Sequence, residues 1–86
     1  MPYIKQINRS MLKSTTDAIA NNAPITVGDL NYLLTKVCHA FLDKQIHRNY
    51  QSYNDVIGAL ECCKLEFYRH VVAPYEEEKI KENGDV

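Results

Sequence analysis

The sequence predicts an all-α protein, a small helical bundle with two long antiparallel helices that forms a homo-oligomer. Apolar residues recur every three or four positions in residues 26–45 and 52–75, and this spacing matches the period of an α-helix. The linker between these stretches, residues 46–51, is short, so we expect the two helices to be antiparallel neighbours. The second stretch is apolar around more of its circumference than the rest of an 86-residue chain can cover, which favours association between copies.

Length and charge narrow the classes of protein to consider. We expect one helical domain over residues 1–86, with an N-terminal arm at 1–9 and a C-terminal tail helix at 75–86. The chain has 10 basic and 11 acidic side chains, which argues against a protein that binds DNA or RNA polymers through a general basic excess. No apolar run approaches the roughly 20 residues of a membrane span, and the start of the chain lacks a signal-peptide core. We therefore expect a soluble, cytoplasmic protein, in the host cytoplasm if a phage encodes it.

The first elements are weakly marked. Residues 1–9 show no clear period, so we expect an irregular arm. Residues 10–22 indicate a weak helix, because its apolar side chains are few and residues 14–16 are poor formers of a helix interior. The run NNAP at residues 21–24 is a helix breaker, so we expect this helix to end there.

The next helix has a clear start. Thr26 is expected to cap it, Asp29 to complete a capping box, and Ile25 to pack on Leu30 as a hydrophobic staple. An apolar stripe then continues to about Gln45. Its members are Leu30, Leu33, Leu34, Val37, Cys38 and Phe41.

The long helix should begin at Ser52, which is a good N-cap residue, with Asp55 three positions later. It carries two apolar lines. The first consists of Tyr53, Val56, Leu60, Cys63, Phe67 and Val71, and the second of Ile57, Leu65, Tyr68 and Val72. Pro74 has no backbone N–H to donate, so the regular helix should stop or kink there.

A last short helix is expected over residues 75–82. Its glutamates precede its lysines, which suits the helix macrodipole, and Glu77 and Lys81 are spaced as an ion pair. Asn83 and Gly84 then form a stop signal.

The residues offer little support for catalysis. The three histidines have neither HExxH spacing nor paired cysteine ligands, and the three glycines are isolated, so we expect no metal, no cofactor and no phosphate loop. Cys62 or Cys63 could pair with His70 on one helix face, but no oxyanion hole is visible around them. We therefore expect a protein that is not an enzyme, and we interpret Cys38 and Cys63 as small buried hydrophobes.

Six tyrosines without a tryptophan suggest two uses for their rings. Most of them should serve packing and interfaces, whereas two or three could stack on nucleobases beside cations that hold phosphates. The candidate ligand-binding residues are Tyr3, Lys5, Arg9, Lys36 and Arg69. For Arg69 the alternative is an ion pair with Glu66 or Glu61 of a neighbouring copy.

Two resemblances add to this interpretation. The segments MPYIKQINR and APYEEEKIKENGDV resemble the termini of a family of small proteins of unknown function from bacteria and their phages. The capped helix, the short loop and the long helix that ends in YRHVVAPYEE resemble the phage anti-CBASS cyclic-oligonucleotide sponges. Arg69, Val71, Pro74 and Glu76 stand in places comparable to the motif of those sponges, whereas Glu66 and Phe67 stand where the sponges favour a tryptophan.

The resemblance implies an all-helical oligomer that traps cyclic nucleotide signals between its subunits without cleaving them. We therefore expect a phage-type anti-defence protein whose partners are its own copies and a nucleotide-derived signalling molecule. The alternative is a helical adaptor or inhibitor that binds a host protein through an apolar helix face.

Overall fold

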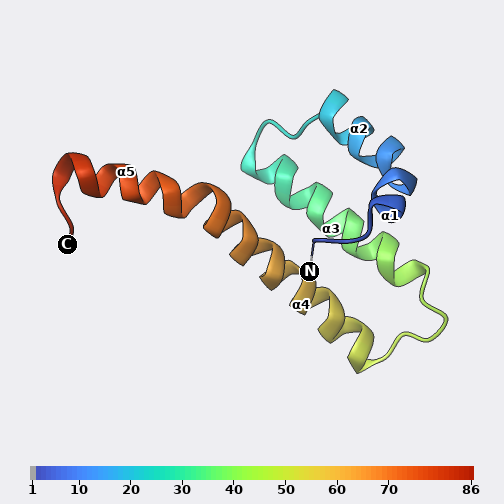
Figure 1. Ribbon diagram of the computed structural model, residues 1–86. Helices are drawn as coiled ribbons and strands as arrows, with labels where there is room; N and C mark the ends of the chain where they lie inside the picture. The colour runs from blue at the N-terminus through green and yellow to red at the C-terminus, as the bar shows by residue number, and fades with distance from the viewer. Residues whose placement is uncertain (1) are drawn as a thin grey trace. The chain divides into compact units, whose positions relative to one another are not determined.

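The computed structural model describes residues 2–86, and it confirms the all-α class, since these residues form helices and no strand (Figure 1). Met1, at the start of the predicted arm, lies outside the described residues. The chain divides into two compact units. We call residues 3–56 the N-terminal unit and residues 57–86, which group with Pro2, the C-terminal unit.

The N-terminal unit begins with two short helices, α1 (Gln6–Met11) and α2 (Lys13–Asn21), that contact each other. The expectation of an irregular arm to residue 9 was wrong, because the helical backbone already begins after Lys5, whose carbonyl accepts the Arg9 N–H at 3.1 Å. A helix without a buried face needs no apolar period, so periodicity could not reveal it. The predicted break after residue 21 is confirmed, because α2 ends at Asn21.

Helix α3 (Val27–Asp43) starts as predicted. The Thr26 hydroxyl accepts the Asp29 N–H at 3.0 Å, and the Asp29 carboxylate accepts the Thr26 N–H at 3.3 Å, which completes the capping box. The predicted staple between Ile25 and Leu30 is wrong, because the Ile25 side chain is 93% exposed. The helix ends at Asp43, close to the predicted position.

Helix α4 (Tyr50–Phe67) starts earlier than predicted, because Asn49 rather than Ser52 caps it. The Asn49 side chain accepts the Ser52 N–H at 3.1 Å, and the Asn49 carbonyl accepts the first helical bond, from the Tyr53 N–H at 3.2 Å. Ser52 lies in the first turn, and its hydroxyl donates to the His47 carbonyl at 3.1 Å. Two capping residues three positions apart were available, and the earlier one, inside the linker, is used.

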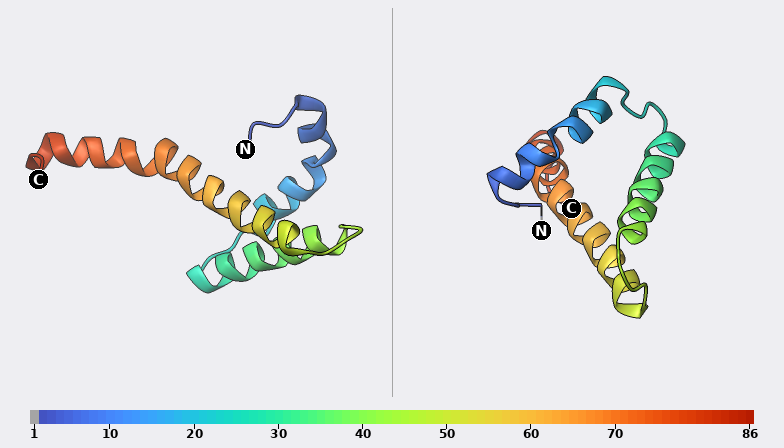
Figure 2. Two further views of the ribbon diagram at one scale, coloured as in Figure 1. Left: turned by 90° about the horizontal axis from the view of Figure 1, so that it is seen from below. Right: turned by 90° about the vertical axis from the view of Figure 1, so that its right-hand side faces the viewer.

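In the C-terminal unit the helical path continues past Pro74, although regular α-helix ends at Phe67. A π-helical segment, η1 (Tyr68–Val72), follows α4 directly and leads into α5 (Ala73–Asn83) (Figures 1 and 2). Pro74 cannot donate to a carbonyl in the preceding turn, and the wider π turn absorbs the missing hydrogen bond. The predicted change at Pro74 therefore takes the form of a π segment rather than a stop.

The end of α5 follows the prediction. Gly84 follows the helix with φ 86°, a left-handed conformation that glycine adopts without a steric penalty. The predicted pairing of Glu77 with Lys81 is wrong, because the Lys81 ammonium lies 3.6 Å from the Glu78 carboxylate instead. The ion pairs on this helix join residues three positions apart. Such exposed pairs stabilise a helix only slightly.

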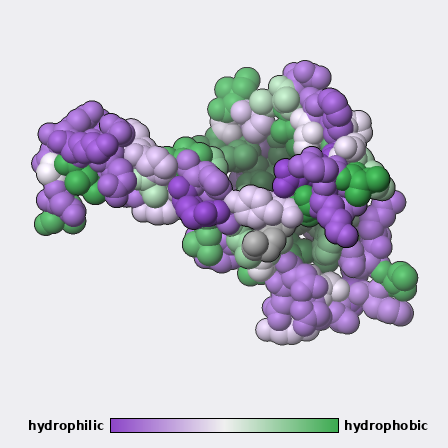
Figure 3. Space-filling model, viewed as in Figure 1, coloured by the Kyte–Doolittle hydropathy of each residue, from purple (hydrophilic) through white to green (hydrophobic). Residues whose placement is uncertain are grey.

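No residue between 2 and 86 is buried, so neither unit contains a hydrophobic core of its own. Figure 3 shows apolar residues at the surface among polar ones. Cys38 is half-buried and Cys63 is exposed, so the expectation of a buried thiol was wrong for Cys63. Of the predicted apolar stripes, Leu33, Cys38, Val56 and Val72 are half-buried, and the other members are exposed within a single copy.

Candidate functional site

The segment η1 is the centre of the candidate site, since it carries the polar side chains of Tyr68, Arg69 and His70 on adjacent positions. A π turn is rare, costs hydrogen-bond geometry and is frequent at functional sites. Here Pro74 explains why the sequence adopts one.

Glu66, one turn before η1, contacts two of these side chains. Its carboxylate accepts a hydrogen bond from the Arg69 guanidinium at 2.7 Å and lies 3.3 Å from Nε2 of His70. The Glu66 side chain is 22% exposed, against 64% for Arg69 and 60% for His70, so the carboxylate lies beneath its two partners. The ion pair with Glu66 forms within one chain, whereas the sequence suggested one between copies.

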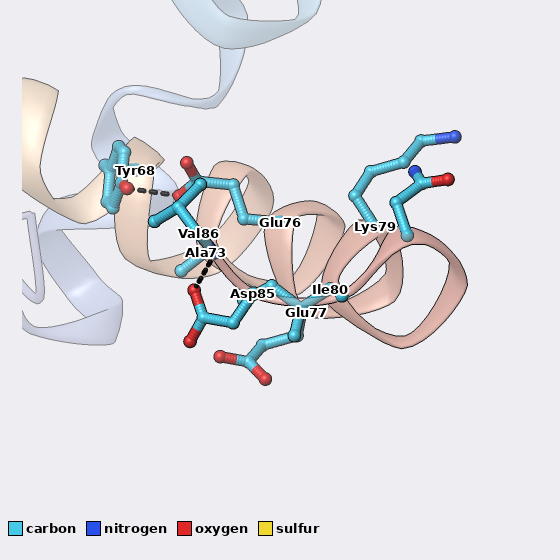
Figure 4. Close-up of a pocket in the computed structure, with 10 residues that line it drawn as sticks. Tyr68, Ala73, Glu76, Glu77, Lys79, Ile80, Asp85 and Val86 are labelled. Carbon is cyan, nitrogen blue, oxygen red and sulfur yellow. Dashed lines mark hydrogen bonds between the residues drawn. The ribbon is translucent and has the colours of Figure 1, made fainter.

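The Tyr68 side chain contacts a residue on the C-terminal side of Pro74. Its hydroxyl donates a hydrogen bond to the Glu76 carboxylate, and this bond spans the π segment and the start of α5 (Figure 4). The hydrogen bond and the negative charge of Glu76 raise the pKa of Tyr68 above its ordinary value of 10.0.

A groove of about 530 Å³ lies beside this bond and is bounded by α5 and by residues 84–86. Figure 4 shows the chain after α5 turning back so that Asp85 and Val86 lie beside the helix. Carboxylates from Glu76, Glu77 and Asp85 line the groove against the single ammonium of Lys79. This balance of charge disfavours a phosphate ligand in the groove.

The predicted ligand-binding residues are divided between the two units. Tyr3, Lys5, Arg9 and Lys36 belong to the N-terminal unit, and Arg69 belongs to the C-terminal unit. The Arg9 side chain turns back on its own segment, because its Nε donates to the Ile4 carbonyl at 3.0 Å.

Lys36 has an aromatic neighbour on α3. Its ammonium lies 5.6 Å from the centre of the Tyr32 ring, within the range of a cation–π interaction. Arg9 lies on α1 and Lys36 on α3, and these two helices do not contact each other within the described residues. Tyr3 is 51% exposed, which leaves part of its ring accessible.

Sequence reasoning missed two contacts of the site, the hydrogen bond between Tyr68 and Glu76 and the contact between Lys79 and Tyr75. The ammonium of Lys79 lies 5.5 Å from the centre of the Tyr75 ring, one turn earlier on α5. The spacing of four residues could have revealed that pair. The bond between Tyr68 and Glu76 could not be found this way, because a spacing of eight has no special meaning in a regular helix.

Comparison with protein families gives a match over residues 1–86 to the family described as "Domain of unknown function (DUF6899)", and the chain belongs to this family. Comparisons with curated proteins and with solved structures give no match. Within residues 2–86, no helix is both long and apolar enough to cross a bilayer, and no group of three or more potential ligand side chains is placed to hold a metal ion.

Proposed function

We propose that this member of the DUF6899 family is a binding protein that works as an oligomer of its own copies and holds a nucleotide-derived immune signal at a subunit boundary without cleaving it. In this proposal α3 and α4 are antiparallel neighbours in a bundle that other copies complete. The observation that carries the proposal is the exposure of the apolar side chains along α3 and the C-terminal helices.

The apolar stripe of α3 illustrates the argument. Leu30, Leu34, Val37 and Phe41 are 40–58% exposed, although the capping box and the period of the helix are both well formed. Covering such a side chain completely is worth about 1.5–3 kcal/mol, so covering the half that remains exposed gains roughly 1 kcal/mol for each. Association of copies would supply this gain, and small helical chains commonly use that route.

The choice of ligand depends on chemistry and on the resemblance to the cyclic-oligonucleotide sponges. Two places in the chain combine an aromatic ring, which can stack on a nucleobase, with cations, which can pair with phosphate. They are Tyr32 with Lys36, and Tyr3 with Lys5 and Arg9, which are close to it in sequence. Arg69 aligns with the motif of the sponges, and a phosphate there would have to compete with the Glu66 carboxylate.

The proposal is tested first by the mass of the assembly and then by ligand binding. We expect light scattering after size exclusion to give an oligomer at micromolar concentration, and a folded monomer would contradict the proposal. Calorimetry with cyclic dinucleotides, cyclic trinucleotides and cyclic ADP-ribose products should then show binding of at least one of them. Recovery of that ligand intact from the denatured complex is expected, whereas turnover would indicate an enzyme.

Arg69→Ala provides the residue-level check. We expect it to weaken binding by about 1.5–3 kcal/mol, the range for hydrogen bonds to charged groups. Lys64→Ala is the matched control, because Lys64 is also an exposed cation in the C-terminal unit, where it lies 3.0 Å from Glu61. An equal effect of both variants would assign the loss to general charge rather than to a site at Arg69.

The same exposed side chains favour a second candidate, a helical adaptor or inhibitor that docks on a host protein. The mass of the isolated protein separates the two candidates. An adaptor would keep its apolar surface open and remain monomeric until its protein partner is added, and none of the nucleotides would bind.

A further inference from the structure

Exposed apolar side chains follow the C-terminal helical stretch at intervals of four residues. Phe67, Val71 and Tyr75 are 60%, 53% and 61% exposed. In a continuous α-helix, two residues eight positions apart differ by about 80° around the axis, since each residue turns the chain by about 100°. Phe67 and Tyr75 would then lie toward opposite edges of one apolar stripe.

The segment η1 changes this relation, because a single π turn inserts one extra residue into the helix. The extra residue removes about 100° of rotation, so that Phe67 and Tyr75 differ by only about 20°. The π segment therefore brings the Phe67 and Tyr75 side chains, before and after it, closer to one line along the helix.

The same geometry applies to Tyr68 and Glu76, which are also eight positions apart. Without the extra residue their side chains would leave the helix in directions about 80° apart, and with it the directions agree to about 20°. Their hydrogen bond is therefore compatible with the π segment and disfavoured by a regular α-helix.

We infer that the hydrogen bond between Tyr68 and Glu76 is a latch that holds η1 in its π conformation, and that η1 in turn sets how closely Phe67 and Tyr75 align along the helix. Pro74 removes the hydrogen bond that would favour a regular helix, and the latch selects the π turn among the remaining arrangements. The inference does not depend on the proposed nucleotide ligand.

Amide hydrogen exchange of the full chain, measured by NMR at a pH near neutral, tests the latch. Tyr68→Phe removes only the hydroxyl, and we expect exchange in residues 70–77 to become about twofold to tenfold faster, the range for loss of one net hydrogen bond. Tyr75→Phe is the matched control, because it removes a hydroxyl from the same stretch and leaves the latch intact. Its exchange rates should stay within a factor of two of those of the original chain.

Two further measurements keep the inference falsifiable. Glu76→Gln retains an oxygen that can accept a hydrogen bond, so its exchange should be slower than that of Glu76→Ala. Unchanged exchange in Tyr68→Phe would overturn the latch. An equal acceleration in α3 would overturn it as well, because it would show a loss of general stability instead of local opening.

Discussion

The guanidinium of Arg69 lies 2.7 Å from the carboxylate of Glu66, one turn earlier in the same helical stretch. His70 approaches the same carboxylate at 3.3 Å. Glu66 therefore both orients the two basic side chains and occupies the place where an anionic ligand would bind them. Under the proposed function, the contribution of Arg69 to ligand binding depends on this competition.

Glu66→Gln is expected to strengthen the binding of a phosphate-containing ligand at Arg69. An exposed ion pair is worth about 0.2–1 kcal/mol, so the affinity should rise by at most about fivefold. Calorimetric titrations of the original chain and of Glu66→Gln, at two salt concentrations, measure the difference. A loss of affinity would show that Glu66 positions the cations more than it competes with the ligand.

Val37→Glu should disrupt self-association, because it places a charge on the apolar stripe of α3, where Val37 is 58% exposed. The mass from light scattering is expected to fall toward that of a single chain. His39→Glu, off the stripe on the same helix, is the matched control and should retain the original mass. Equal masses for both variants would exclude the α3 stripe as the interface.

Thr26→Ala should destabilise the start of α3 by about 1 kcal/mol, the usual contribution of an N-cap side chain. The hydroxyl of Thr26 accepts the Asp29 N–H, and alanine cannot replace it. Thr35→Ala is the control, since the Thr35 hydroxyl donates to the Asn31 carbonyl within the helix instead of capping it. Thermal unfolding followed by circular dichroism, with amide exchange at residues 27–30, compares the two variants.

Acid should loosen the same end of α3. Hydrogen bonds from the backbone of Thr26, and then from Ile25 and the Thr26 side chain, lower the pKa of Asp29 below its ordinary value of 3.8. Because the pKa is lowered by folding, the stabilisation is present above that ordinary value and is lost as the pH falls through the lower pKa of the folded state. Protection factors for the amides of residues 27–30, from which the intrinsic pH dependence of exchange has been divided out, should show this loss between pH 5 and pH 2, and Asp29→Asn should abolish that fall in protection.

High pH should weaken the hydrogen bond between Tyr68 and Glu76. Because the pKa of Tyr68 is raised in the folded chain, the stabilisation by its bond to Glu76 is present below the ordinary value of 10.0 and is lost as the pH rises through the higher pKa of the folded state. Glu76→Gln removes the charge and should lower the pKa of Tyr68 toward the ordinary value. Ultraviolet absorption titration of single-tyrosine variants measures it, and an unchanged pKa would contradict the role of Glu76.

The sequence predicted correctly the helix ends that depend on neighbouring residues. It failed for features that depend on geometry beyond one helical turn. The capping box at Thr26 and the stop at Gly84 follow from neighbouring residues and are confirmed. Both Asn49 and Ser52 are good caps, so the start of α4 could not be chosen from residue type alone. The helix at residues 6–9 has no buried face and left no periodic signal.

The candidate site was only partly accessible to the same reasoning. Arg69 was chosen from a motif, and its partner Glu66 was one of the alternatives considered. The bond between Tyr68 and Glu76 requires the extra residue of η1, and no rule of spacing in a regular helix predicts it. The proline that causes the π segment was recognised, but its effect was expected to be a stop or a kink.

The absence of buried side chains among residues 2–86 changes what a mutational scan of this protein would report. In an ordinary domain the most sensitive positions map the interior of one chain. Here, truncations to alanine that cost more than about 1 kcal/mol outside the caps would trace the surfaces that another molecule covers. A tolerance map of the free chain, set beside one of the assembled protein, would therefore outline the contact area without a further structure.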